Sequence, residues 1–588
     1  MIRPFRKLGS LFPEPLKGFF ERRPAALPIA LALLCDVPLA ALGSEFQALR
    51  WTAFALLMLL LVIPVFAVLF RALRHLWSRR RDRRFLKLLA LNVLCAALLA
   101  FAYPPLPLGW LSFVLLAPWL WTLRRLPLRD GLTITFAAGW VFSAIMYFWI
   151  YNVAAVGPPV AVIGGLALLL CYLALFRVAA GWLFLRLDRA GKRWLFPFVW
   201  SGLEVFRAWG EMSFPWEHLG YATGVSLPLM QAASWIGVYG LSALVVAANL
   251  VALDALERRS WRRGLAVLLF PAGLLLFGAV SLSSEPEVSR SVRVAVLQPN
   301  IPQHVKWEKK NFPQWMRRTF GLVDRVDSGS VDLVVLPETA VPRLARDVRL
   351  PEGRGYIRQH ADLRSRAAKR GYDVVAGFLD ADTLGPAPRR FRFYNAAFLF
   401  RADGSEPQRY CKRKLVPFSE KLPWDGLLPM LNYVDLGEGD FSPGEGDALW
   451  GGRGDWAPSI CYEVVYPAFM RDQALAGARL MVNITNDGWF GRTTAPWQHA
   501  NIARFRSVEL GLPLARAANT GVSLFYDAKG RLLDSTPIFE EAAIRAELEI
   551  PVSPAPYAAV GGPLEAILLA LLLAVFAWAL FTRDPEFP

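Results

Sequence analysis

Histidine and cysteine are scarce in this chain, with five of each among 588 residues. The histidines show neither the HxxxH nor the HExxH spacing of a zinc site, so we expect no metal ion. The cysteines are too few for a disulfide-rich scaffold, which depends on many bridges. A single bridge between Cys411 and Cys461 remains an open alternative, because these two alone lie outside the apolar segments described next.

Charged residues are also few, at 19% of the chain, whereas 55% of the residues are hydrophobic and the mean hydropathy is +0.34. A soluble globule needs less apolar surface than this, so we expect a membrane protein. Runs of about 20 apolar residues, the length that crosses a bilayer core as a helix, recur in the first half and once near the C-terminus. An alternative for the first run is a cleaved signal peptide, and the runs at 110–123 and 195–209 are short enough to be re-entrant. The ten candidate helices are 27–42, 52–73, 86–103, 110–123, 134–156, 160–185, 195–209, 227–256, 265–282 and 564–581.

Basic residues gather in alternate loops between these runs. The stretches 79–84 (RRRDRR), 186–193 (RLDRAGKR) and 257–263 (ERRSWRR) are strongly basic, while 103–109 and 156–159 hold no Lys or Arg. Because positive loops stay on the cytoplasmic side, we expect both termini there and the long segment before the last helix on the far side of the membrane. The net charge of +17 is therefore largely a signal of topology, and we expect no nucleic-acid partner.

The segment 285–558 has the composition of a soluble domain, in which short β-rich runs alternate with helical stretches. Several of the runs are apolar on both faces, which favours a layered α/β fold with a buried sheet and with its chemistry at the strand ends. The expected strands are 292–300, 331–338, 372–378, 394–400, 459–463, 478–487 and 521–533. The chain then divides into an N-terminal extension with two membrane helices (1–84), a multi-helix membrane domain (85–284), the α/β domain (285–558), and a C-terminal membrane helix with a short cytoplasmic tail (559–588).

Three polar residues lie at or near the ends of expected strands. Glu338 ends DLVVLPE and would suit a general base, although a cap for the following turn explains it equally well. Lys412 precedes the apolar LVPF and would suit a fixed positive charge for an oxyanion, although a solvated basic edge is the plainer interpretation. Cys461 lies in SICYE and would suit a nucleophile, although a strand cysteine is more often a core residue. Together they supply the base, the cation and the nucleophile that acyl transfer needs.

The order and context of these residues carry a resemblance. The Glu-Lys-Cys order in LPET, YCKRKLVPFSE and SICYE resembles the nitrilase superfamily, whose αββα sandwich carries such a triad. With its membrane helices and further motifs, the chain from about residue 85 resembles the apolipoprotein N-acyltransferase family. Lys414 and Ser419 depart from the usual histidine and glycine of the family, and the two helices before residue 85 are additional to its usual set. The further motifs are QPNIPQHVKWE (298–308), NITNDGWFG (483–491), the pair Gln498 and His499, and RAANTGVS (516–523).

The resemblance implies an acyltransferase that works through a thioester and needs no cofactor. Glu338 would take the proton of Cys461, the thiolate would attack a phospholipid ester, and Lys412 with the backbone N–H of Tyr462 would hold the oxyanion. The acceptor would be the N-terminal amine of a diacylglyceryl-cysteine apolipoprotein. The resemblance also implies a multi-pass protein of the bacterial inner membrane with its α/β domain in the periplasm, and we expect a monomer in contact with membrane lipid. The supporting carboxylates would be Glu420 and Glu463, and the candidate substrate contacts are Trp216, Trp307 and Trp489.

Plainer interpretations stay open beside these. Each tryptophan would equally serve as an ordinary membrane-belt or core residue, and Glu463 as a partner in a strand-end salt bridge. Two other functions also remain: a membrane-anchored nitrilase-like amidase, and a non-catalytic lipid-binding or transport protein. The second expects ionisable residues inside the spans, where Arg177 is the clear instance. Cys411 should point away from its neighbour Lys412 in an extended strand, so we do not expect it to bridge to Cys461.

Overall fold

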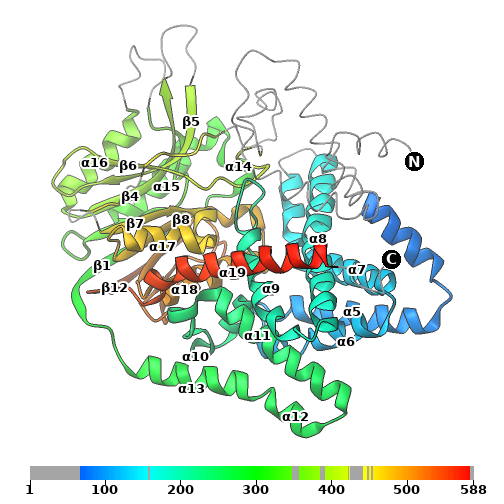
Figure 1. Cartoon of the computed structure of the whole chain (residues 1–588). Coiled ribbons are helices and arrows are strands. Elements are labelled where there is room, and N and C mark those ends of the chain that lie inside the picture. The colour runs from blue at the N-terminus through cyan, green and yellow to red at the C-terminus, as the bar shows by residue number, and fades with distance from the viewer. Residues whose placement is uncertain are drawn as a thin grey trace.

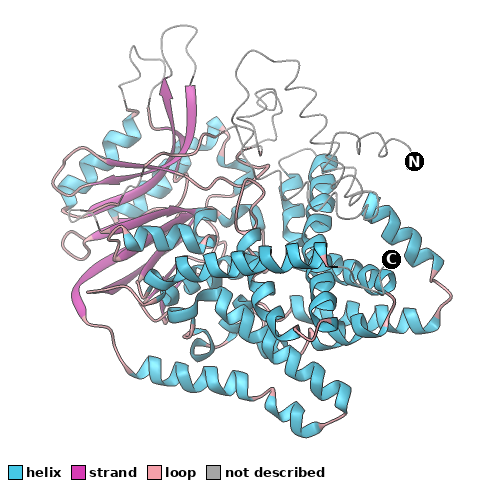
Figure 2. Ribbon diagram, in the orientation of Figure 1, coloured by secondary structure: helices cyan, strands magenta, loops and turns pink. Residues whose placement is uncertain are grey.

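The structure is a computed structural model, and it describes residues 67–582 except for 156–158, 347–355, 384–390, 422, 424–440, 447–448 and 452–454. A bundle of helices lies beside an α/β domain (Figures 1 and 2). The expected helix at 27–42 and the first part of the one at 52–73 lie outside the described residues. Residues 67–78 are helical and form the end of that second expected helix.

Five helical stretches in the described part of the chain are long and apolar enough to cross a bilayer. They are Leu128–Val153, Val162–Arg189, Ala233–Arg258, Trp261–Ser283 and Tyr557–Phe581. The chain is therefore a membrane protein, as its composition predicts. The last stretch, α19 (Tyr557–Phe581), returns to the bundle after the α/β domain and packs against α9 (Phe196–Arg207) and α11 (Ala233–Arg258) (Figure 1).

Two of the expected membrane helices are interrupted or short. The run 110–123 is not one helix, because it breaks into the 3₁₀ turn η2 (Gly109–Phe113) and the short helix α6 (Ala117–Arg125). Helix α9 has 12 residues, which at 1.5 Å per residue reach only about 18 Å and do not cross a core of about 30 Å. Neither run is among the five candidate spans, and the re-entrant interpretation stays a prediction for both. The remaining helical elements of the bundle are α5 (Arg83–Ala100), α7 (Leu128–Tyr147), η3 (Phe148–Ala155), α8 (Pro159–Arg189), η4 (Arg193–Leu195), η5 (Leu219–Val225), α10 (Leu227–Met230), α12 (Trp261–Ala266) and α13 (Leu269–Ser283).

Helix α11 is kinked at Gly237, where φ is 61° and ψ is −177°. A side chain would strain the backbone there, and its Cβ atom would clash with the ring of Tyr557 in α19. The backbone N–H of Val238, just after the kink, donates to Glu509 Oε1 at 2.8 Å. Glycine is therefore required where α11 passes α19. The hydrogen bond just after the kink connects α11 to α18 (Ala495–Leu510) of the α/β domain.

The α/β domain holds two sheets among the described residues. The first has the strand order β12-β1-β2-β4-β5-β6 with β3 beside β4, and β1, β2 and β4 run parallel. The second has the order β11-β10-β9-β8-β7, in which β7, β8 and β9 run parallel. The strands are β1 (Val288–Gln298), β2 (Leu333–Val335), β3 (Val341–Leu344), β4 (Asp373–Thr383), β5 (Phe391–Phe400), β6 (Gln408–Cys411), β7 (Trp456–Ile460), β8 (Leu480–Thr485), β9 (Leu514–Ala518), β10 (Leu524–Tyr526), β11 (Leu532–Ser535) and β12 (Ala542–Pro551).

Alternate residues of the first sheet enter two different cores. In β1, Val294 and Val296 join a core shared with the second sheet, whereas Ala295 and Leu297 join a core beneath helices α15 and α16. Helices α17 and α18 contact the second sheet. The result is an αββα sandwich, as the sequence predicts (Figure 2). The helices first named here are α15 (Phe312–Asp324), α16 (Arg358–Arg370) and α17 (Pro467–Leu475).

The sandwich and the helical bundle meet along α18 and α17. Helix α18 contacts η5, α11 and α19 of the bundle on one side and β9 on the other, and its buried residues include every position from Gln498 to Leu510 except Arg504. Arg471 of α17 donates from Nη1 to Glu565 Oε1 of α19 at 2.6 Å. The α/β domain is therefore packed directly on the membrane helices, with both halves sharing one apolar core.

Candidate active site

Glu338 lies just beyond β2, in the LPET turn, and its side chain is buried. Asn395 Nδ2 donates to Glu338 Oε1 at 2.6 Å, and Lys412 Nζ lies 3.8 Å from the same oxygen. Burial raises the pKa of Glu338, Lys412 opposes that rise, and Glu420 adds to it. The net rise moves the pKa of this carboxyl toward the range of a general base.

Lys412 lies directly after β6, and only 1% of its side chain is exposed. Its Nζ donates to Glu420 Oε1 at 2.8 Å, and Glu420 Oε2 accepts from the backbone N–H of Val416 at 2.9 Å. Burial disfavours the charge, but Glu420 and Glu338 outweigh burial and raise the pKa of Lys412. The amine is therefore a buried, fixed positive charge, and its interpretation as part of a solvated basic edge is wrong.

Cys461 directly follows β7 and opens the 3₁₀ turn η9 (Cys461–Val465), with a φ of 51°. A non-glycine residue in this left-handed region costs roughly 1–3 kcal/mol, and such strain clusters at functional sites. Desolvation raises the pKa of the thiol, Glu338 raises it further, and Lys412 lowers it. The resting thiol is therefore protonated, and its ionisation is coupled to both of the other strand-end residues.

The alternative of a bridge between the two extramembrane cysteines is not realised. Cys411 and Cys461 are both free thiols. Cys411 packs against the core beneath α15 and α16, whereas Lys412, the next residue, faces Glu338 and Glu420. The expectation that Cys411 points away from Lys412 is thus confirmed.

Glu463 lies two residues after Cys461 and is fully buried. Its carboxylate accepts hydrogen bonds from a tyrosine hydroxyl and from three backbone N–H groups. The donors are Tyr410 Oη (2.8 Å), Ile460 N (2.7 Å), Arg413 N (2.6 Å) and Lys414 N (3.0 Å). These bonds tie the turn at Cys461 to the loop after Lys412. Glu463 therefore braces the backbone beside Lys412, whereas Glu420 contacts the amine itself.

Tyr462, whose backbone N–H is the expected oxyanion donor, has a buried ring that faces the helical bundle. The ring of Trp216, from the segment between α9 and η5, lies nearly parallel to it at 15°, with centroids 6.5 Å apart. Trp216 Nε1 donates to Gln498 Oε1 of α18 at 2.9 Å, and the side chain is 2% exposed. Trp216 thus lies between the two halves of the molecule, and its contact with substrate stays a prediction.

The other two expected tryptophans are more open to solvent. Trp307 follows α14 (Gln303–Lys306) and is 47% exposed. Trp489 is half-buried in η10 (Asp487–Phe490), which contacts η3 of the bundle; there Asn152 Nδ2 donates to the Phe490 carbonyl at 2.7 Å. Trp489 therefore lies where the α/β domain meets the bundle, and substrate contact stays a prediction for both tryptophans.

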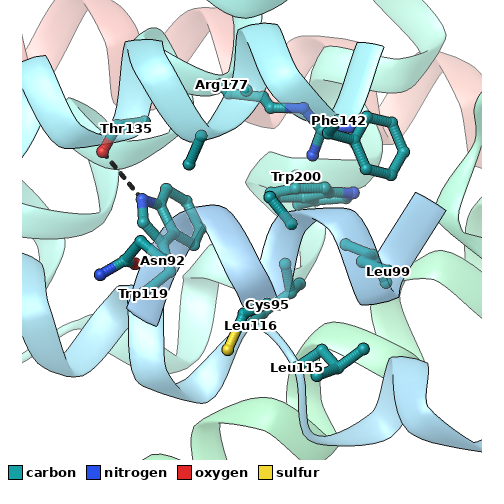
Figure 3. Close-up of a pocket in the computed structure, with 13 residues that line it drawn as sticks. Asn92, Cys95, Leu99, Leu115, Leu116, Trp119, Thr135, Phe142, Arg177 and Trp200 are labelled. Carbon is teal, nitrogen blue, oxygen red and sulfur yellow. Dashed lines mark hydrogen bonds between the residues drawn. The ribbon is translucent and has the colours of Figure 1, made fainter. Parts of the chain in front are cut away.

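A cavity of about 40 Å³ lies inside the helical bundle (Figure 3). Its wall includes Trp119, whose Nε1 donates to Thr135 Oγ1 at 2.8 Å. Arg177, the ionisable residue expected inside a span, reaches its edge with the guanidinium 3.8 Å from the ring centroid of Phe142. Ligand pockets usually measure about 300–1,000 Å³, so this cavity has room for water and not for an acyl chain.

Sequence reasoning missed three polar contributors to the site. Asn395 lies inside the apolar run of β5, and a polar residue in the buried phase of a strand was the available signal. Lys306 Nζ lies 3.3 Å from the Glu338 carbonyl oxygen and 2.5 Å from Thr339 Oγ1, so it holds the turn that carries the carboxyl. His499, noted only as part of a motif, contacts the carbonyl of Cys461.

The arrangement joins a carboxyl, an ammonium and a thiol on a strained turn. These are the base, the oxyanion cation and the nucleophile of a thiol-based acyl transfer. Among the described residues, no group of three or more His, Cys, Asp or Glu side chains is arranged to hold a metal ion.

Two family models match this chain. The model described as apolipoprotein N-acyltransferase N-terminal domain matches residues 95–251, and the model described as carbon-nitrogen hydrolase matches residues 293–552. The apolipoprotein N-acyltransferase of Geobacter metallireducens is 35% identical over 479 residues, which cover 78% of this chain and 88% of that protein. The chain belongs to the apolipoprotein N-acyltransferase family. Membership in this family makes the protein an enzyme.

Other members of the apolipoprotein N-acyltransferase family are also similar. The protein of that name from Bradyrhizobium diazoefficiens is 33% identical and covers 63% of this chain and 71% of its own length. The one from Haemophilus influenzae is 28% identical, and the match covers 80% of this chain and 91% of that protein. Among solved structures, the carbon-nitrogen hydrolase from Helicobacter pylori is 18% identical with a TM-score of 0.32, covering 50% of this chain and 99% of that one. An amidase from Nesterenkonia sp. AN1 is 19% identical with a TM-score of 0.32, and the match covers 47% of this chain and 95% of the amidase.

Proposed function

We propose that this enzyme moves a fatty acyl chain from a phospholipid, through a thioester on Cys461, to the N-terminal amine of a diacylglyceryl-cysteine apolipoprotein. The observation that carries the proposal is the convergence of Glu338, Lys412 and Cys461 from three strand ends, in a domain packed on membrane helices. The names of the relatives support the choice of acceptor.

In the first half-reaction, Glu338 takes the proton of the Cys461 thiol, because a thiol with a raised pKa needs a nearby base. The thiolate attacks the carbonyl carbon of a phospholipid ester, and the ester C–O bond then breaks. Glu338 returns the proton to the leaving alkoxide. A lysophospholipid departs, and the acyl chain remains on the sulfur as a thioester.

In the second half-reaction, the N-terminal amine of the apolipoprotein attacks the thioester carbonyl. Glu338 accepts the amine proton, an amide bond forms, and the C–S bond breaks. The proton then passes from Glu338 to the departing thiolate of Cys461, which restores the resting enzyme. The order is ping-pong, and atoms and protons balance without any further reactant.

Each half-reaction passes through an oxyanion on the former carbonyl oxygen. Lys412 faces this charge as a buried ammonium, and we assign the backbone N–H of Tyr462 as the second donor. Glu420 holds the ammonium at 2.8 Å, and Glu463 joins the backbone just before Cys461 to the backbone just after Lys412. Fixed donors of this kind stabilise the transition state without reorganising during the reaction.

Both proposed substrates carry acyl chains in a membrane leaflet, so a site tethered to membrane helices meets them without removing them from the lipid. The exposed ring of Trp307, the half-buried ring of Trp489 and, on the side of the bundle, the buried ring of Trp216 are the proposed contacts with these chains. We place the enzyme in the bacterial inner membrane as a monomer, with the α/β domain on the periplasmic side.

The test uses purified full-length protein in liposomes with an acyl-labelled phospholipid and no acceptor. Wild-type protein should acquire a label that neutral hydroxylamine releases, and Cys461→Ala should acquire none. Cys411→Ala is the matched control, because Cys411 is the other free thiol of the α/β domain and should not affect labelling.

Adding a diacylglyceryl lipopeptide should then move the label onto its N-terminal amine. A folded wild type with reduced Cys461 that never acquires label would contradict the proposal. Label that passes only to water would instead indicate a hydrolase.

A further inference from the structure

The carbonyl of Cys461 has a partner on α18. Strand β7 ends at Ile460, and Cys461 leaves the strand with a φ of 51°. His499 Nε2 lies 3.2 Å from the Cys461 carbonyl oxygen. A non-glycine residue stays in this conformation only where its surroundings hold it. The contact with His499 therefore bears directly on the direction in which the thiol points.

The neighbours of the imidazole decide which nitrogen carries the proton. A carbonyl oxygen only accepts hydrogen bonds, so His499 Nε2 carries a hydrogen and donates it to the Cys461 carbonyl. His499 Nδ1 lies 3.0 Å from Arg516 Nη2, a donor, and 3.1 Å from Asp487 Oδ1, an acceptor. Burial and Arg516 lower the pKa of His499 although Asp487 raises it, so the imidazole is neutral and its Nδ1 accepts from Arg516. This is the tautomer that holds the nucleophile's backbone.

Arg516 is itself held by charges and amides beneath the site. Burial opposes the ionisation of Asp487, but Arg516 and His499 outweigh it and lower the pKa of Asp487 to about 2. Asp487 Oδ2 lies 3.0 Å from Arg516 Nη2, and Arg516 Nη1 donates to Asn483 Oδ1 at 2.5 Å. Asn483 in turn donates to Ser459 Oγ of β7 at 3.0 Å. The network thus closes on the strand that leads into Cys461.

The helical bundle also contacts this network. The ring centroid of Trp216 lies 5.3 Å from the ring centroid of His499. The same ring stacks with Tyr462, the residue after Cys461. Trp216 also donates to Gln498, the residue before His499. One side chain from the bundle therefore contacts His499 itself and the residue that follows Cys461.

We propose that His499 is a positioning residue for the thiol: its Nε2–H fixes the Cys461 carbonyl and so aims the sulfur at Glu338 and Lys412. Arg516 acts through His499 by donating to its Nδ1, and Asp487 acts by holding Arg516. This inference rests on the proposed function, in which Cys461 is the nucleophile.

The test compares two replacements of similar length, His499→Gln and His499→Met. Glutamine offers an N–H to the Cys461 carbonyl, and methionine offers none. His499→Gln should keep kcat within about threefold of wild type, while His499→Met should lose about 10- to 100-fold in kcat, with KM nearly unchanged. A purely space-filling role would leave the two variants equal.

Alkylation of Cys461 by iodoacetamide, read from the mass of the Cys461 peptide, gives a second measure that needs no acyl donor. Its rate should fall in His499→Met and hold in His499→Gln. The matched control is His360→Met, because His360 is also a buried imidazole, 2% exposed, but lies on α16 at the outer face of the domain. That variant should leave both rates unchanged.

Equal rates for the Gln and Met variants in both assays would overturn the proposal. Should the Met variant not fold, His499→Leu replaces it as the variant without an N–H, and His499→Gln stays its partner in the comparison. If wild-type Cys461 alkylates but never forms a thioester, the proposed function fails, and the alkylation rates still decide the role of His499.

Discussion

A single amide nitrogen lies between two carboxylates at this site. Asn395 Nδ2 donates to Glu338 Oε1 at 2.6 Å and to Glu420 Oε1 at 3.1 Å. The same two oxygens lie 3.8 Å and 2.8 Å from Lys412 Nζ. A shared N–H donor and a shared cation allow two like charges to stay close. Asn395 therefore favours the ionised form of the proposed base.

The first prediction concerns Asn395→Leu. The substitution removes a hydrogen bond that lowers the pKa of Glu338, so that pKa should rise further. Because Glu338 accepts a proton only when ionised, the acid limb of the pH profile for thioester formation should move to higher pH. Asn311→Leu is the control, since Asn311 is a partly buried amide that also donates to a carboxylate, that of Glu308 at 2.9 Å, in another part of the α/β domain. An acid limb that stays in place would refute this role.

The second prediction concerns Glu463→Gln. Every partner of the Glu463 carboxylate is a donor, so the amide N–H of glutamine would meet donors only. We expect a loss of about 1–3 kcal/mol in unfolding free energy, with slower thioester formation, measured by thermal unfolding in detergent and by labelling. Glu541→Gln, at a surface carboxyl 33% exposed, should change stability by less than about 0.5 kcal/mol. Equal effects of the two substitutions would contradict this account.

The three strand-end residues could be predicted from the sequence because an apolar run that stops at a polar side chain marks the edge of a sheet. A polar residue in a buried strand marks Asn395, but its partner could not be predicted, since Glu338 is 57 positions away and only the folded sheet brings them together. The role of Glu463 was also hidden, because most of its partners are backbone amides, which carry no signature in the sequence.

At the scale of elements, buried and regular strands were predictable, while short or half-polar ones were not. The expected runs overlap β1, β2, β4, β5, β7 and β8. The run 459–463 shares only its first two residues with β7, because η9 begins at Cys461, and the run 521–533 is not one strand, because it is divided between β10 and β11. Strand β12 alternates polar and apolar residues at the edge of its sheet, and β9 has the sequence LARAA, whose alanines are uncommon in strands. Pairing with β8 and full burial override that propensity in β9. The shortness of the run 195–209 was visible in the sequence, and α9 is shorter still, because it begins at Phe196 and ends at Arg207.

The third prediction concerns the kink of α11. Gly237→Ala should strain the backbone at φ 61° and press a methyl group against Tyr557, costing about 1–3 kcal/mol or more. The measurement is thermal unfolding in detergent. Gly273→Ala in α13 is the matched control: nothing lies within 4 Å of the added methyl, so it should be neutral or stabilising by up to about 1 kcal/mol. Equal melting temperatures would show that the kink tolerates a side chain.

At the scale of the whole molecule, the basic loops of the bundle meet at one face. Arg124 at the end of α6 donates to Asp188 at the end of α8 at 2.6 Å, and Arg193 lies 3.1 Å from Asp254 near the end of α11. Arg186 donates to the Thr582 carbonyl at 2.7 Å, which brings the end of α19 to the same face. Loops that the charge pattern assigns to the cytoplasm thus lie together, which supports the proposed orientation.

The last prediction tests that orientation with single cysteines. Lys310→Cys lies in the α/β domain, where the lysine side chain is 79% exposed, and Arg262→Cys lies at an exposed position in α12 on the basic face. In cells whose outer membrane has been removed, a membrane-impermeant maleimide should label Lys310→Cys and not Arg262→Cys. Labelling of the wild-type protein gives the background from the native cysteines. Lysis should make both reactive. Label on Arg262→Cys alone before lysis would place the catalytic domain in the cytoplasm. The domain could not then reach an acceptor whose amine lies on the outer face of the membrane. The proposed acceptor substrate would be wrong, even if the thioester forms.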